Sequence, residues 1–339
     1  MKVFSQIFSL FLGLKLFSDE LFGPKNSMIN SVKIYIEERE QFGNCVSCNC
    51  KHDLEAMVHC VIENSGFLTN NKADSTFIFV PQYLDSRRNQ GFPNIPASVR
   101  GDEQFQLYKG AKHLFVDGLV SFKSFPGYLE FNDERIVITP NLTTSFIRKD
   151  RWKNSRHIQI PTMQSLEIPG RTMKKHNTVF FGLIEGIEND IASIGAKVIT
   201  DSSIFFKEIA SSNFTVFRPS IHYHPSLIYD IIRCGSIPVL ISDPYLPAYA
   251  NSHIDYNKIS IRIPFANISS LKNRIDGFNV EKAMVLLGNA SKFLTWPQDG
   301  IPRKSNAAGV LLEYLGYRHH VIRPVLRRTF IGTNEIIDK

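Results

Sequence analysis

Segment 214–243 most constrains the fold of this chain, because it has the pattern of a complete strand–helix–strand unit. The apolar run FTVF (214–217) is typical of a strand, and Pro225 suits the first turn of the helix that follows a polar loop. Gly235 suits the residue past the end of that helix, and IPVLI (237–241) is typical of a second, buried strand. The unit predicts a crossover between two parallel strands of one sheet.

Short apolar runs recur along the rest of the chain, most of them ending at turn-forming residues. Runs of this length are typical of strands that are buried on both faces of a parallel sheet. Segments with helical spacing lie between and after them, and this alternation predicts an α/β fold. The predicted strands are 32–37, 76–80, 113–116, 136–139, 158–160, 178–181, 197–200, 214–217 and 237–241, and the predicted helices are 54–65, 204–211, 225–234, 269–275, 280–293 and 306–317.

The length of the chain favours more than one domain. It has 339 residues, 43% of them hydrophobic, which excludes a disordered protein and is long for one compact core. A polar, basic stretch broken by Pro and Gly (168–177) predicts a linker between two Rossmann-like parallel-sheet domains. The predicted division is an N-terminal segment 1–28, a first domain 29–170, a second domain 171–300, and a C-terminal helix with a basic tail, 301–339.

The formal net charge of +7 favours an acidic ligand, such as a nucleotide diphosphate, an anionic glycan or a membrane surface. Nucleic acid is not expected, because the sequence has no long Lys/Arg run with interleaved aromatic residues. At the N-terminus, Lys2 precedes an apolar stretch of signal-peptide length (3–14) that is short for a membrane span. Two interpretations remain: a secretory signal or short anchor, and an amphipathic helix packed on the body of the protein.

Four of the five cysteines lie close together, at 45, 48, 50 and 60. With a secretory start, this spacing predicts one or two local disulfides among Cys45, Cys48, Cys50 and Cys60. The alternative is a zinc site made of these thiolates with His52 or His59, although the spacing lacks the usual pair of CxxC motifs. Cys234 stands alone, and we expect it to be a small buried hydrophobic residue.

We expect a ligand-binding site where the strand 214–217 ends. Ligands of open parallel sheets bind outside the carboxyl ends of the strands, and the following helix directs its free N–H groups to the same place. Arg218 would bind a diphosphate through charge-assisted bonds, with Ser220 and Ser226 in the loop and at the helix start. Asp230, one turn into the helix, would accept hydrogen bonds from a ribose. The competing interpretations are a surface ion pair for Arg218 and a solvated helix residue for Asp230.

Several motifs in chain order resemble those of the exostosin family of glycosyltransferases. The most specific is YDIIRCGSIPV with DPYLP (229–247), which is similar to the family signature "(E/D)A-x-x-x-GCIPV…D…LPF". Gly235 and Asp243 belong to this signature, and so the resemblance assigns them to the donor site. Weaker matches are 73–81 to "AD-x-F-x-VP", 110–115 to "G-x-(D/N)-H-(F/L)", 178–182 to "FF-x-G", 212–219 to "S-x-F-C-L-x-P-x-G" and 292–294 to "RFL".

The resemblance implies a GT-B architecture, in which two Rossmann-like domains face a cleft. It also implies inverting transfer of a sugar from a nucleotide donor, mostly UDP-linked, to a glycan, in the Golgi or endoplasmic reticulum and without a required metal. An inverting enzyme needs a general base from the facing domain. Asp117, at the carboxyl end of the strand 113–116, is our first candidate; His113, at its start, is the second, and its competing interpretation is a core histidine.

The sequence also departs from the family pattern. The family has an arginine three residues before the acidic residue, and here Leu227 occupies that place; Arg218, His222 or Arg233 are alternatives for its role as a phosphate ligand. Ser236 replaces the cysteine of the signature. The loss at Leu227 leaves a second hypothesis, an exostosin-fold protein without donor chemistry that binds glycan or a partner glycosyltransferase.

Overall fold

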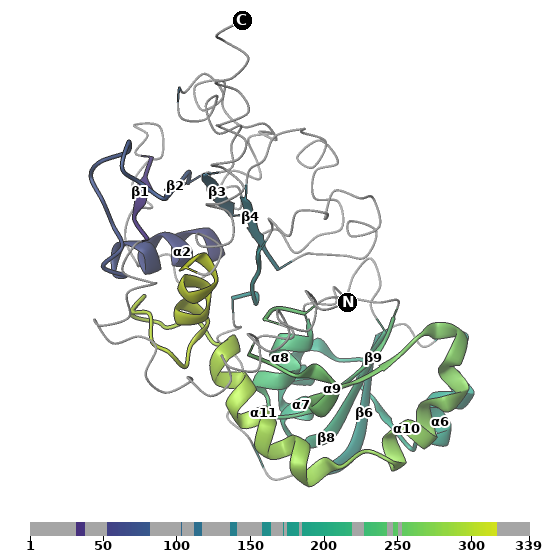
Figure 1. Ribbon diagram of the computed structural model, residues 1–339. Coiled ribbons are helices and arrows are strands. Elements are labelled where there is room, and N and C mark those ends of the chain that lie inside the picture. The colour runs from purple at the N-terminus through teal and green to yellow at the C-terminus, as the bar shows by residue number, and fades with distance from the viewer. Residues whose placement is uncertain are drawn as a thin grey trace, which may run out of the picture.

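The computed structural model of the chain (Figure 1) consists of two halves, each built on a parallel β-sheet. The structure describes residues 32–37, 53–81, 103, 112–116, 136–140, 158–163, 172, 175–182, 185–218, 227–242, 247–249 and 253–316. The predicted leader 1–28 and the basic tail after 316 lie outside these residues, as do most of the predicted linker 168–177 and its flanks. The exact domain boundaries therefore stay a prediction.

The first half contains a five-stranded sheet whose strands follow one another in sequence order, β1-β2-β3-β4-β5, and all pair in parallel. Helix α2 (Leu54–Glu63) packs against it, and nine of its ten residues are buried. The carboxylate of Asp53 caps the helix by accepting from the N–H groups of Glu55 and Ala56, at 2.8 and 3.1 Å. The strands are β1 (Ile34–Ile36), β2 (Phe77–Phe79), β3 (His113–Val116), β4 (Ile136–Thr139) and β5 (Ile158–Gln159).

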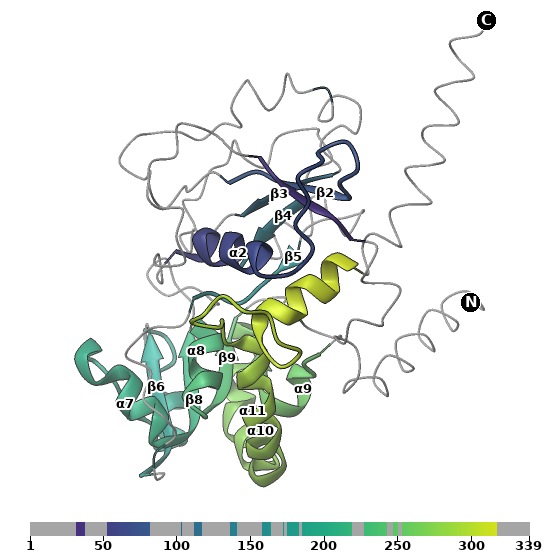
Figure 2. The same cartoon turned by 90° about the vertical axis from the view of Figure 1, so that its left-hand side faces the viewer.

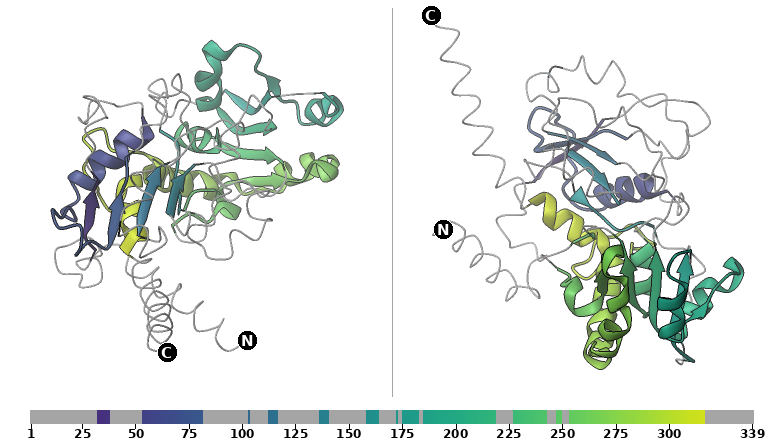
Figure 3. Two further views of the ribbon diagram at one scale, coloured as in Figure 1. Left: turned by 90° about the horizontal axis from the view of Figure 1, so that it is seen from above. Right: turned by 90° about the vertical axis from the view of Figure 1, so that its right-hand side faces the viewer.

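The second half contains a parallel five-stranded sheet of order β10-β9-β8-β6-β7, with flanking helices (Figure 3). Non-sequential neighbours mean that the chain crosses over between strands, as in doubly wound sheets. The strands are β6 (His176–Gly182), β7 (Lys197–Val198), β8 (Ser212–Arg218), β9 (Ile237–Ile241) and β10 (Ile261–Ile263). The helices are α6 (Glu188–Ser193), η5 (Ser202–Ile204), α7 (Phe205–Ala210), α8 (Leu227–Arg233), α9 (Tyr256–Ile259), η6 (Phe265–Ser270), α10 (Leu271–Asp276) and α11 (Val280–Leu294).

The predicted crossover over 214–243 is confirmed by β8, α8 and the parallel partner β9. Gly235 ends α8 with φ +73°, and its N–H donates to the carbonyl of Ile232 at 2.9 Å. All five residues of β9 are buried, as a strand covered on both faces requires. Two sheets of parallel strands with helices confirm the predicted α/β class.

Two described segments lie at the junction of the halves: residues 160–163, and the residues that follow α11. The chain leaves the first half through residues 160–163 after β5, and it returns after α11, where Trp296 donates from Nε1 to the carbonyl of Pro161 at 3.1 Å. Gly300 then packs so closely on Cys60 of α2 that a Cβ at this position would overlap the sulfur. The helix over 307–316 follows, beside the first half (Figures 1 and 2).

The structure describes two cysteines, Cys60 and Cys234. Cys60 is disulfide-bonded, so it has no thiolate for the zinc alternative; Cys45, Cys48 and Cys50 lie outside the described residues. Cys234 is not disulfide-bonded and is fully buried, which confirms the prediction for it. Among the described residues there is no group of three or more side chains that could hold a metal ion, and no helix long and apolar enough to span a bilayer.

Candidate functional site

The carboxyl ends of β6 and β8 lie in close contact at Gly182 and Arg218, which are partners in the strand register. Gly182 has φ +124°, a conformation that side chains rarely adopt, and a Cβ there would lie 2.9 Å from the carbonyl oxygen of Arg218. Only glycine fits this contact. The close approach fixes the backbone from which the Arg218 side chain leaves the sheet.

The Arg218 side chain lies over the carboxyl edge of the second sheet. Its Nη1 donates to the carbonyl of Glu185, after β6, at 2.7 Å, and its guanidinium carbon lies 4.3 Å from the ring centre of Phe265, after β10. Nε and Nη2 make no hydrogen bond within the described part of the chain. An arginine held by one nitrogen and by an aromatic face is well placed to bind phosphate oxygens with the other two.

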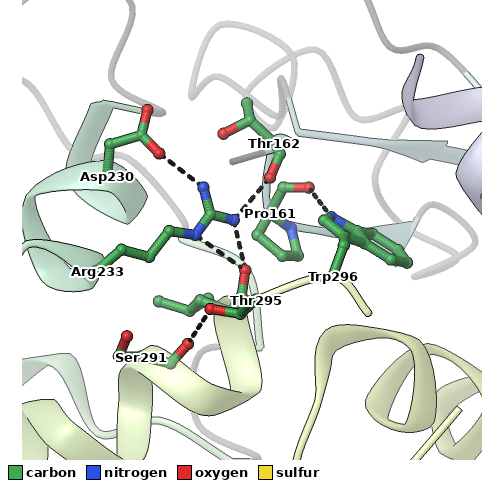
Figure 4. Close-up of polar contacts among 8 residues, drawn as sticks. Pro161, Thr162, Asp230, Arg233, Ser291, Thr295 and Trp296 are labelled. Carbon is green, nitrogen blue, oxygen red and sulfur yellow. Dashed lines mark hydrogen bonds and ion pairs between the residues drawn. The ribbon is translucent and has the colours of Figure 1, made fainter. Parts of the chain in front are cut away.

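Asp230 on α8 forms an ion pair with Arg233, one turn further along the helix (Figure 4). Oδ1 of Asp230 accepts from Nη1 of Arg233 at 2.7 Å, and the side chains are only 16% and 3% exposed. Burial raises the pKa of the Asp230 carboxyl, while the neighbouring guanidinium acts in the opposite direction. Oδ2 of Asp230 has no hydrogen-bond partner among the described residues, which leaves one oxygen to accept from a ligand hydroxyl.

Arg233 is bonded through all three of its side-chain nitrogens (Figure 4). Besides Asp230, it donates from Nη2 to the carbonyl of Thr162 at 2.7 Å, and from Nε to the carbonyl of Leu294 at 3.2 Å, with a second, short bond from Nη2 to Leu294. Of the three alternatives for the missing family arginine, Arg233 is therefore occupied with structural contacts. His222 lies outside the described residues, and Arg218 is the remaining alternative.

The other predicted site residues divide into three groups. Ser220, Ser226, Asp243 and Asp117 lie outside the described residues. Gly235 precedes β9 and so lies toward the amino edge of the sheet, where it ends a helix. His113 begins β3 and is 1% exposed, a position that suits a core histidine better than a base in contact with an acceptor. Within the described residues no contact joins Arg218 to Asp230.

Ser236, which replaces the signature cysteine, belongs to a buried cluster of hydroxyl groups near the amino ends of β8 and β9. Its Oγ lies 2.8 Å from Oγ1 of Thr215 and 3.1 Å from Oγ of Ser212. Each buried hydroxyl thus has a partner, as burial of polar groups requires. This departure from the family pattern is accommodated within the fold and does not touch the Arg218 edge.

Sequence reasoning missed the partners of Arg218 and the contacts of Arg233. Phe265 follows β10, a strand that was not predicted, and it is 45% exposed. The acceptors at Glu185, Thr162 and Leu294 are main-chain carbonyls, which residue identity does not encode. The one available signal was Phe265 itself, an aromatic residue directly after a Pro that ends a short apolar run.

Two parallel sheets with helices define a two-domain α/β protein, in agreement with the predicted GT-B-like fold. The chain belongs to the exostosin family of glycosyltransferases: the family model described as the Exostosin GT47 domain matches residues 28–278. A comparison with curated proteins gives no match.

Solved structures of glycosyltransferases are similar to this chain at low identity. A chain of the GtfA/B complex has 9% identity and a TM-score of 0.37 over 71% of this chain, which spans only 57% of that chain. AviGT4, a glycosyltransferase involved in avilamycin A biosynthesis, has 8% identity and a TM-score of 0.36, covering 85% of this chain and 98% of that one. The glycotransferase of kitacinnamycin has 9% identity and a TM-score of 0.36, with 84% and 98% covered. Scores of this size carry no argument about the site.

Proposed function

We propose that this chain transfers a sugar, with inversion, from a nucleotide-sugar donor, a UDP-sugar, to a hydroxyl of an oligosaccharide or polysaccharide acceptor. The observation that carries the proposal is Arg218, two of whose nitrogens, at the carboxyl edge of the second sheet, have no hydrogen bond to any residue that the structure describes. Ligands of open parallel sheets bind outside this edge. Membership of the exostosin family supports the same reaction class.

Inverting transfer is a single displacement at the anomeric carbon. The acceptor oxygen forms a bond to that carbon, and the bond from the carbon to the diphosphate oxygen breaks, leaving its electron pair on the diphosphate. Arg218 would stabilise the growing negative charge by charge-assisted hydrogen bonds, with Ser220 and Ser226 as further donors. The proton of the acceptor hydroxyl passes to a general base, for which we propose Asp117 first and His113 second.

We propose that the donor ribose binds at Asp230, because Oδ2 of that carboxylate has no hydrogen-bond partner among the described residues. Asp243 and Gly235 are the remaining residues that we propose for the donor site. Gly235 acts indirectly, by ending α8. The proposal needs no metal, since Arg218 and the start of the helix supply the positive charge. It also places the protein in the lumen of the Golgi or endoplasmic reticulum, with membrane association through the N-terminus.

A second function is favoured by one specific observation. Leu227, at the place of the family arginine, is apolar and packs against the hydrophobic core, so it offers nothing to a phosphate. On this alternative the chain keeps the fold without donor chemistry and acts as a glycan-binding protein or as the partner of another glycosyltransferase.

Calorimetric titration with UDP separates the two functions. Saturable heat with wild-type protein supports the donor site, and the loss of one charge-assisted arginine contact in Arg218→Ala should weaken UDP binding about tenfold to a hundredfold. Arg303→Ala is the matched control, because Arg303 is an exposed arginine that pairs with Asp299. No heat at millimolar UDP would favour the binding protein.

A donor-hydrolysis screen across UDP- and GDP-sugars then tests the reaction. Release of UDP from one sugar donor, reduced in Arg218→Ala and in Asp230→Ala but not in Arg303→Ala, is the expected result. Turnover of a GDP-sugar in preference to every UDP-sugar would contradict the assignment of the donor.

A further inference from the structure

The Arg233 guanidinium touches both described segments at the junction, where the chain passes between the halves. Thr162 belongs to the segment that leaves the first half, and Leu294 is the last residue of α11, two residues before Trp296 in the segment that returns. One side-chain nitrogen, Nη2, donates to the carbonyls of both. Figure 4 shows the Asp230 carboxylate and the Thr162 carbonyl at different nitrogens of the guanidinium.

This arrangement depends on the shape of the arginine side chain. A guanidinium is planar and directs its donors in a fixed fork, so carbonyls on two segments and a carboxylate on α8 are held in one fixed relation. A lysine has a single nitrogen and cannot keep this geometry. Because the Arg233 side chain is 3% exposed, water cannot easily replace a lost contact.

We propose that Arg233 is a positioning residue of the donor site: it holds the Asp230 carboxylate and ties it to both chain crossings, so that donor binding at Asp230 and the arrangement of the two halves depend on each other. The inference rests on the function proposed above. Such a dependence is reciprocal. The factor by which one arrangement of the halves raises donor affinity equals the factor by which bound donor favours that arrangement.

Among the described residues, two tyrosines also act on Arg233. Tyr249 and Tyr256 interact electrostatically with Arg233, and burial raises the pKa of both hydroxyls well above the ordinary value of 10.0. Both therefore stay neutral at ordinary pH. A difference between the pH profiles of the wild type and the Arg233 variants is therefore assigned to Asp230.

The test compares Arg233→Met and Arg233→Lys with the wild type in two measurements. The first is the affinity for UDP as a function of pH. The second is amide hydrogen exchange of peptides that cover 158–163 and 290–300, with and without UDP. Arg303→Met is the control, since Arg303 is exposed and pairs with Asp299 rather than with Asp230 or the carbonyls of Thr162 and Leu294.

Arg233→Met should bind UDP about tenfold more weakly and lose affinity further as the pH falls, because a buried carboxylate without a cation takes up a proton more readily. It should also exchange faster at both crossings, and UDP should no longer slow that exchange. Arg233→Lys should recover the pH profile of the wild type, since it restores the charge, but not the protection of the two crossings. If Arg233→Met does not fold, the lysine variant alone must show this separation.

The outcomes distinguish this inference from the proposed function. Wild-type protein that binds no UDP overturns both. Wild-type protein that binds UDP, with an Arg233→Met variant of equal affinity and unchanged pH profile, overturns the positioning role alone, even where hydrogen exchange is faster. A lysine variant identical to the wild type in both measurements would show that charge suffices and would overturn the tie to the crossings.

Discussion

The side-chain amide of Gln159, the last residue of β5, lies 3.4 Å from the hydroxyl of Tyr229 on α8. The same hydroxyl accepts from the N–H of Ala248 at 2.9 Å, and all three groups are buried. One phenol oxygen thus serves a side chain of the first half and the main chain of the segment that follows the predicted donor residue Asp243. This contact links α8 to the first half, as does the hydrogen bond from Arg233 to the carbonyl of Thr162.

Replacing Tyr229 by Phe should lower stability by about 1–3 kcal/mol, because it leaves the buried N–H of Ala248 without its acceptor. The free energy of urea unfolding measures the loss. Tyr35→Phe is the matched control and should change it by much less, since the Tyr35 side chain is half-buried and lies beside Lys72. Equal losses in the two variants would show that the Tyr229 hydroxyl has no special role.

Gly182→Ala should be more damaging than an alanine at an unhindered glycine. The added Cβ meets the carbonyl oxygen of Arg218 at 2.9 Å in a backbone conformation that strains any side chain, and we expect a cost of about 1–3 kcal/mol. Thermal unfolding gives the stability, and UDP titration reports the position of Arg218. Gly288→Ala is the control, because a Cβ at Gly288, within α11, meets nothing within 4 Å. A Gly182 variant with wild-type stability would contradict the close approach.

Much of the fold was predictable because it is encoded locally. Strands such as β2 and β9 are short, continuous apolar runs bounded by turn residues, and burial on both faces makes this pattern unavoidable. β10 was missed because it has only three residues with the exposed Arg262 at its centre. The predicted strand 197–200 shortens to Lys197–Val198, an exposed edge strand that has little burial to encode.

The site was predictable only where residue identity and position in the sequence indicate a role. Arg218 follows from its place at the end of a strand, but its carbonyl partner at Glu185 lies 33 residues earlier in the chain. Arg233 was considered as a phosphate ligand, and its actual partners include two carbonyls, 71 and 61 positions away. Main-chain acceptors carry no sequence signal, so the hydrogen bonds of Arg233 to the two carbonyls became apparent only in three dimensions.

Glu208 makes the stability of the second half depend on pH. Lys197 donates to the Glu208 carboxylate at 2.7 Å, and His176 lies 3.2 Å from it. The hydrogen bond from Lys197 is the largest cause that lowers the pKa of Glu208 below its ordinary 4.5. A carboxylate with a lowered pKa stabilises the fold above its unfolded pKa and loses this effect as the pH falls through the folded value.

The wild type should therefore exceed Glu208→Gln in stability at neutral pH, and the difference should vanish as the pH falls well below 4.5. The difference should be about 0.5 kcal/mol, because Lys197 is 42% exposed and solvent screens the pair. Urea unfolding of both proteins across this pH range provides the measurement. A difference that grows toward acid pH would mean that the carboxylate is destabilised in the fold.

Trp296 tests the second crossing independently of Arg233. Its indole N–H donates to the carbonyl of Pro161 at 3.1 Å, and the side chain is 1% exposed. Trp296→Phe keeps an aromatic ring but removes the donor and leaves space, so unfolding should cost about 1–3 kcal/mol less than in the wild type. Phe293→Leu, on the partly buried side of α11, is a control for ring loss nearby. If the Trp296→Phe variant also shows faster hydrogen exchange over 158–163 but not over 212–218, the loss is located at the junction. Faster exchange throughout the second sheet would instead mean that Trp296 stabilises the second half as a whole.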